Sequence, residues 1–256
     1  MCFERVFAFV LLCLPAFACS VLEDRDVCPC IFTLDMSGID ERCVEECEIS
    51  HLLYDCGEKG CLPAEEIPPM LVAKVKKSEF EWFVQCVGAG WKISLPDSLF
   101  IPFGMECPPV YSGRGAPFTA CEEARDSVVL HRSFTFLNIS TTGFAGKRMR
   151  VTSTTCGCTL EGVPLEGGFE VSFIIPVSGE VKVAVPRQAN DGLMLEIDIG
   201  DALTGNFAIG HYIAASGYDW SAEDLCDISL KVDYTSTSVS YGTEPWPETY
   251  FYHIIF

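Results

Sequence analysis

The sequence predicts an all-β protein of the sandwich type, because short segments alternate apolar and polar residues with a period of two. Turn-forming residues separate these segments, as at 190–192 (NDG). Hydrophobic residues make up 49% of the chain and charged residues only 21%, so the chain can bury a substantial core. Short strands separated by turns are typical of sandwiches. In the C-terminal half the alternating segments are 169–175, 181–185, 193–199 and 228–234.

The N-terminal half shows a similar but weaker pattern, which predicts strands at 30–36, 71–76, 80–87 and 91–95. A glycine-rich loop and an acidic stretch follow, and a fresh strand is expected from Val128. We therefore expect an N-terminal β-sandwich domain over 19–124, with an acidic spacer at its start, and a C-terminal β-sandwich domain over 125–256.

Few helices are expected, and the one that is signalled is short. Ser221 has the position of an N-cap, and Asp224 follows three residues later, which is a capping pattern.

The start of the chain predicts export. The apolar run 6–17 is too short to span a bilayer and ends in small residues, as a secretory signal does. The signal peptide is expected at 1–18, and Cys19 then becomes the first residue. A cysteine at this place suggests a lipoprotein, since its thiol can carry a thioether-linked lipid. An ordinary secreted protein is the alternative.

The net charge limits the classes of partner that the protein can bind, and the cysteine count raises the question of disulfides or metal. The net charge of −19 repels nucleic acid and anionic lipid head groups, so neither is an expected partner. Of the fifteen cysteines, Cys2 and Cys13 leave with the signal and Cys19 takes the lipid, which leaves twelve. Disulfides or buried thiols are expected for these, and zinc is the rival interpretation.

We expect no catalytic residue, no cofactor and no metal site. The sequence has no nucleophile elbow, zinc-protease motif, phosphate-binding loop or dinucleotide fingerprint. The four histidines have no ligand spacing. Three aspartates that lie close together offer a calcium alternative, but they suit a capped, solvated turn as well: Asp219, Asp224 and Asp227.

One longer motif carries a resemblance to a known family. Residues 210–228 (GHYIAASGYDWSAEDLCDI), together with 28–34 (CPCIFTL), 129–134 (VLHRSF) and 185–188 (VPRQ), resemble the FimB-type fimbrial anchor lipoproteins of Gram-negative gut and oral anaerobes. The resemblance implies two transthyretin-like β-sandwich domains in a surface-exposed outer-membrane lipoprotein. Such an anchor attaches the fibre to the membrane through lipid and ends its growth, with fimbrial stalk or accessory pilin subunits as partners.

The last residues form an apolar segment that we expect to act in assembly. Tyr250, Tyr252, Ile254 and Phe256 share one face of an extended strand. The segment either completes its own sheet or is donated to a neighbouring pilin, as subunits of the resembled family do. Two other functions stay open: a stalk or tip fimbrial subunit, and a glycan- or ligand-binding surface lipoprotein in which Trp82, Trp91, Trp220 and Trp246 form a sugar platform.

Overall fold

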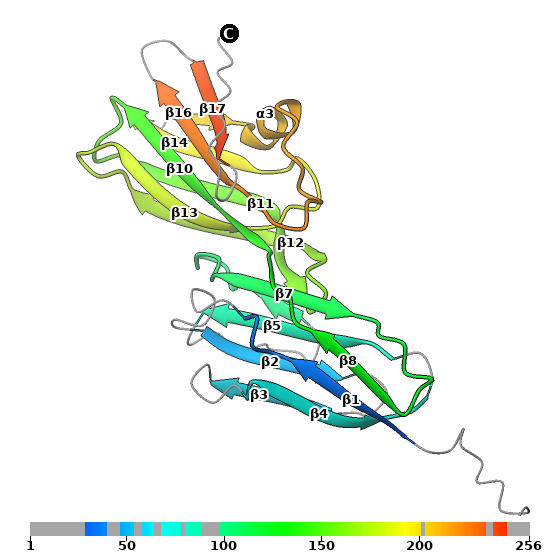
Figure 1. The fold of residues 1–256 in the computed structure, drawn as a ribbon. Coiled ribbons are helices and arrows are strands. Elements are labelled where there is room, and N and C mark those ends of the chain that lie inside the picture. Colours follow the sequence, from blue (N-terminus) through cyan, green and yellow to red (C-terminus); the bar gives the residue numbers. More distant parts are fainter. Residues whose placement is uncertain are drawn as a thin grey trace, which may run out of the picture.

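The computed structural model consists mainly of β-strands, which form two groups of sheets (Figure 1). The predicted all-β sandwich class is therefore confirmed. The described part of the chain has one helix, α3 (Ile209–Ala215), and no helix there is long and apolar enough to cross a membrane. The structure describes residues 29–39, 47–53, 58–63, 68–77, 80–88, 98–200, 203–233 and 238–244.

Two sheets of the N-terminal half enclose one core. Their strands are β1 (Cys30–Asp35), β2 (Cys47–Leu53), β3 (Glu58–Pro63), β4 (Met70–Val75), β5 (Trp82–Gly88), β7 (Val110–Gly115), β8 (Glu123–Ser127) and β9 (His131–Arg132). The sheet orders are β4-β1-β8 and β3-β2-β5-β7-β9. Phe32 and Leu34 of β1 share a buried cluster with Trp82 and Val84 of β5. The alternating apolar residues of β1 thus fill the space between the sheets.

Two sheets of the C-terminal half enclose a second, larger core. Their strands are β10 (Phe134–Thr142), β11 (Arg148–Thr159), β12 (Pro164–Ile174), β13 (Glu180–Pro186), β14 (Met194–Gly200), β15 (Leu203–Phe207), β16 (Asp227–Asp233) and β17 (Ser238–Glu244). The orders are β13-β10-β16-β17 and β12-β11-β14-β15. Leu137 and Ile139 of β10 share one buried cluster with Leu195 and Ile197 of β14. The strands expected at 193–199 and 228–234 are confirmed over their described residues. The apolar positions that face this core are Leu193, Leu195, Ile197, Ile228, Leu230 and Val232.

A segment of the N-terminal half crosses to the C-terminal sheets. The short strand β6 (Ser98–Phe100) pairs with the end of β11, where Phe100 lies opposite Gly157. The chain then continues along the second half: the Ile101 amide donates to the Cys156 carbonyl (2.8 Å) and the Cys107 amide to the Ala184 carbonyl (3.3 Å). Backbone hydrogen bonds therefore join the two halves, and the side chains of Ile101 and Cys107 belong to the C-terminal core.

The expected strand from Val128 is wrong in position. The polar segment β8 comes first and pairs in parallel with β1, and the long strand β10 begins only at Phe134. Val128 instead donates its amide to the Asp35 carbonyl (2.8 Å) and is buried in the N-terminal core. The proposed domain boundary at 124/125 falls inside β8, and the division into two domains stays a prediction. The strand expected at 91–95 lies outside the described residues.

Replacing Gly157 with alanine is expected to weaken the junction between the halves. A Cβ atom at this position would lie 2.0 Å from the Leu99 carbonyl oxygen, so β6 would have to move away from β11. We expect the free energy of unfolding to fall by roughly 2–3 kcal/mol, measured by chemical denaturation. Gly168→Ala is the matched control, because a Cβ atom there meets nothing within 4 Å. Equal stability of the two variants would contradict the described β6–β11 contact.

Candidate functional site

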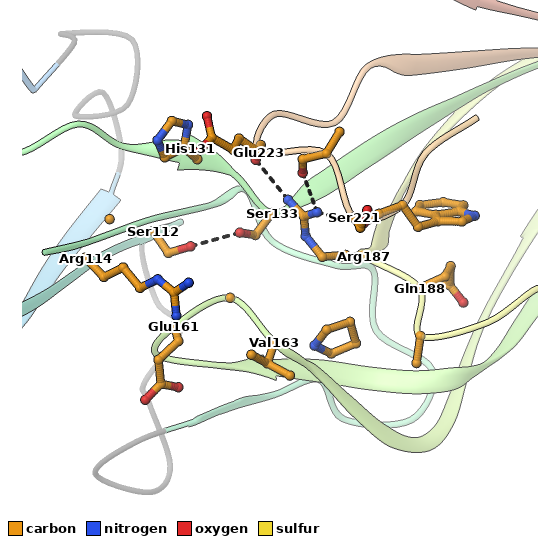
Figure 2. A pocket seen from close by; sticks show the side chains of 16 residues that line it. Ser112, Arg114, His131, Ser133, Glu161, Val163, Arg187, Gln188, Ser221 and Glu223 are labelled. Carbon is orange, nitrogen blue, oxygen red and sulfur yellow. Dashed lines mark hydrogen bonds between the residues drawn. The ribbon is translucent and has the colours of Figure 1, made fainter. Parts of the chain in front are cut away.

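A cavity of about 680 Å³ lies where the two groups of sheets meet (Figure 2). Strand β7 supplies one wall through Ser112, Gly113 and Arg114. The other walls come from segments that leave strands of the second half or lead into them. The residues of these segments that line the cavity are His131 and Ser133, together with all residues of 161–164, 187–189 and 220–223.

The side chain of Arg187 holds one wall of the cavity in place. Its guanidinium, which follows the end of β13, donates to the carbonyls of Trp220 (2.7 Å), Ala222 (2.6 Å) and Glu223 (3.0 Å). A fourth hydrogen bond reaches the Arg132 carbonyl (3.2 Å). Figure 2 shows Arg187 pointing toward segment 220–223. Since Arg187 is only 8% exposed, these bonds satisfy a charge that would otherwise be buried without partners.

The charge of Arg187 is also balanced by its surroundings. Burial lowers the pKa of the Arg187 guanidinium. The phenol of Tyr218 and the carboxylates of Asp224 and Asp219 act in the opposite direction and raise this pKa. A guanidinium stays charged in proteins, so the Arg187 side chain acts as a cation that organises backbone oxygens.

The helix expected at Ser221 is wrong, and Arg187 explains why. A helix uses its carbonyls for bonds within the segment, but here the Trp220, Ala222 and Glu223 carbonyls accept from Arg187. Asp219 accepts from the Ser221 amide (2.8 Å), which forms a local turn. The helix of this region, α3, lies earlier, with Ile209 and Ile213 buried.

Arg132 and the aspartates form a second set of contacts behind the cavity. The Arg132 guanidinium pairs with Asp227 and lies 4.4 Å from the centroid of the Phe134 ring. Asp224 accepts from the Arg132 amide (2.8 Å) and lies 3.2 Å from Nδ1 of His131. These carboxylates therefore fix segment 219–227 to β9 and β10.

The serine side of the cavity is tightly packed. The hydroxyls of Ser112 and Ser133 are 2.9 Å apart and hydrogen-bond to each other across the junction. Gly162 lies against them with a positive φ of 80°, and a Cβ atom there would be 2.8 Å from Oγ of Ser112. Glycine is therefore required at this position for both its conformation and its size.

The lining of the cavity offers groups that can bind a polar ligand. These are hydroxyls and, on Arg114 and Glu161, charged groups at least partly open to solvent. A ligand rich in hydroxyl groups matches this set of donors and acceptors. Nε1 of Trp220 and Oε1 of Gln188 are buried without a hydrogen-bond partner and do not belong to the set.

The structure places the residues singled out from the sequence in very different settings. Trp82 is buried and donates to Asp126 (2.8 Å), whereas Trp220 borders the cavity; the two do not form a platform. Among the described residues, no three His, Cys, Asp or Glu side chains form a metal-binding group. Seven cysteines lie in the described part of the chain, and none of them is drawn in a disulfide: Cys30, Cys86, Cys107, Cys121, Cys156, Cys158 and Cys226. Several predicted residues lie outside the described part of the chain: Cys19, Trp91, Trp246, Tyr250, Tyr252, Ile254 and Phe256.

The sequence reasoning missed Arg187 as a site residue. Its only signal was a cation placed directly after an apolar strand, in 185–188 (VPRQ). Its four partners are backbone carbonyls, which no sequence pattern marks.

Comparison with known proteins supports the fold. No protein-family profile and no curated protein matches the sequence. A candidate polysaccharide-binding protein of Bacteroides thetaiotaomicron is similar in structure, with a TM-score of 0.59, 8% identity, and coverage of 88% of this chain and 98% of that one. The fimbrial anchor protein Mfa2 of Porphyromonas gingivalis has a TM-score of 0.55 at 8% identity, covering 87% of this chain and 100% of Mfa2. A candidate adhesin of Bacteroides ovatus has a TM-score of 0.53 at 10% identity, covering 91% of this chain and 98% of the adhesin. At these identities the likeness concerns the fold.

Replacing Arg187 with methionine is expected to loosen segment 220–223, which forms a wall of the cavity. The substitution keeps much of the side-chain volume but removes four hydrogen bonds and leaves carbonyls without their partner. We expect a loss of about 3 kcal/mol in the free energy of unfolding, measured by denaturant titration. Arg114→Met on the exposed wall of the same cavity is the control and should change stability by less than about 0.5 kcal/mol. A stable Arg187→Met variant would refute the organising role of Arg187.

Proposed function

We propose that this protein is a structural subunit of a surface fimbria and forms the lipid-anchored base that attaches the fibre to the outer membrane and limits its length. The observation that supports this best is the fold, which matches Mfa2, a fimbrial anchor, over the whole of that chain. An anchor acts by binding, and it needs no assembled catalytic group. The resemblance of segment 210–228 to fimbrial anchor lipoproteins points to the same role.

Sheet edges would give such an anchor a means of binding fimbrial stalk or accessory pilin subunits. Among the described strands of the C-terminal half, β17 and β15 each form one edge of a sheet. The opposite edges, β13 and β12, already accept hydrogen bonds from the amides of Cys107 and Gly104. An extended segment of a partner that is added to such an edge gains a row of backbone hydrogen bonds. This binding mode requires no pocket and no cofactor.

The membrane end of the anchor is Cys19 in our proposal. The described chain begins shortly after it, at the N-terminal sheets, and β10–β17 form the opposite end of the molecule (Figure 1). Lipid at Cys19 would therefore place the N-terminal half next to the membrane and the C-terminal half toward the fibre. Stable attachment needs more than one acyl chain, which a diacylated cysteine provides.

A second candidate function is glycan binding at the cavity beside Arg187. The observation in its favour is the lining of the cavity by hydroxyl, charged and indole groups. One structural neighbour is a candidate polysaccharide-binding protein. This function would make the protein a surface adhesin, and the experiment below separates the two roles.

Replacing Cys19 with alanine in the native bacterium is expected to release the fibres. Without the thiol no lipid is attached, so a fatty-acid probe should label the wild type and not the variant. Electron microscopy should then show fibres in the medium instead of on the cell surface. A variant with Cys13→Ala, a change within the expected signal peptide, is the control.

Two results would contradict the proposal. Equal lipid labelling of wild type and Cys19→Ala would exclude the lipid site. Unchanged fibres in a strain lacking the protein, together with weaker adherence to polysaccharide, would favour the glycan-binding role.

Truncation after Glu248 is expected to test the role that we propose for the last segment. If Tyr250, Tyr252, Ile254 and Phe256 are donated to a pilin, the shortened protein should fold and be lipidated but lose the fibre. The measurement is thermal unfolding of the purified protein beside microscopy of the cells. A large fall in melting temperature would instead assign the segment to its own sheet, because removing a core strand exposes apolar surface.

A further inference from the structure

Two thiols lie next to each other where the first described strand begins. Cys30 is the first residue of β1 and is fully buried, at 0% exposure. Cys121 is exposed and lies two residues before β8. Burial raises the pKa of the Cys30 thiol, and the Cys121 thiol raises this pKa further through its charge and through a hydrogen bond. The two side chains are therefore direct neighbours.

A backbone hydrogen bond joins the two chain segments beside these thiols. Strands β1 and β8 are parallel, with Ile31 opposite Glu123, and the Ile31 amide donates to the Glu122 carbonyl (2.8 Å). Cys30 directly precedes Ile31, and Cys121 directly precedes Glu122. A disulfide needs this closeness of the two backbones, because it forms only at Cα separations of about 4.4–6.8 Å.

We infer that Cys30 and Cys121 form a disulfide in the exported protein, which fastens the start of β1 to the segment that leads into β8. This inference rests on the proposed function only in that export places the chain in an oxidising compartment.

The bridge forms by thiol–disulfide exchange with a dithiol–disulfide oxidase of the cell envelope. The exposed Cys121, as a thiolate, attacks one sulfur of the oxidase disulfide, which gives a mixed disulfide and releases the other oxidase sulfur as a thiolate. The Cys30 thiolate then attacks the Cys121 sulfur and expels the oxidase as a dithiol. Two thiol protons leave the protein and two electrons pass to the oxidase. Exposure decides the order, because the oxidase can reach Cys121 but not the buried Cys30.

The position of the bridge gives it a mechanical use in the proposed anchor. Tension between a lipid at Cys19 and the fibre enters the fold at the first residue of β1. Without a bridge, only hydrogen bonds to β4 and β8 and the packing of residues such as Phe32 resist removal of β1. A disulfide at Cys30 passes the load to the β8 side as well.

The test uses full-length protein purified from bacterial envelopes without reductant and alkylated before digestion with trypsin. Mass spectrometry should find peptide 26–42, which carries Cys28 and Cys30, linked to peptide 115–125, which carries Cys121. The link should persist in Cys28→Ser and vanish in Cys30→Ser. Complete alkylation of Cys30 and Cys121 in the wild type, or a link that persists in Cys30→Ser, would overturn the inference.

Stability provides a second readout with an exposed, fold-tolerant variant. Reductant should lower the melting temperature of the wild type by roughly 5–10 °C and leave Cys121→Ser unchanged. An equal shift in both would place the sensitive disulfide elsewhere and contradict the pairing. The protein carrying Cys19→Ala should keep the bridge, so failure of the lipid assignment and failure of the disulfide are distinguishable.

Discussion

The buried guanidinium of Arg187 is the interaction on which the wall of the cavity between the two halves depends. It gathers carbonyls from two separate segments, 220–223 and residue 132, around one charge. A buried cation without partners is costly, and so is a buried carbonyl without a donor. Each group therefore constrains the other. The position of segment 220–223 and the shape of the cavity follow from that mutual requirement.

The junction has a second support in the backbone of residues 98–107. This part of the N-terminal half pairs with β11 and places Ile101 in the C-terminal core. A small cluster, in which Leu99 of β6 and Cys158 of β11 meet Val87 and Val110, fills the space between the two larger cores. Arg187 holds one side of the cavity in place, and the packing around Leu99 holds together the two halves that supply the cavity walls. The cavity is thus a product of both contacts.

The sequence predicts the secondary structure correctly where burial follows a local period along the chain. The alternation at 193–199 and 228–234 predicts the strands because every second residue faces the same core. It was insufficient where long-range contacts decide the backbone. Ser221 and Asp224 have the pattern of a capped helix, yet Arg187 takes the carbonyls that a helix would need. Helix α3 escaped notice because it is short, contains Gly210 and has no side-chain cap.

The candidate site was harder to predict than the strands for the same reason. Residue types such as Ser112 and Ser133 carry no signal of their own, and only the fold brings their hydroxyls to 2.9 Å. The sequence resemblance included Arg187 within 185–188, but a motif does not say which distant carbonyls a side chain will bind. Trp220 was considered as part of a sugar platform, and the structure separates it from the buried Trp82.

The parallel pairing of β1 with β8 also affects the order in which the chain can fold. Strand β1 precedes its partner β8 by most of the N-terminal half of the chain. The second half repeats this arrangement, since β10 pairs in parallel with β16. Contacts between residues so distant in sequence slow folding, because a long loop must close first. While the chain folds, one edge of β1 and one edge of β10 therefore stay unpaired until each half is nearly complete, and such edges are prone to aggregation.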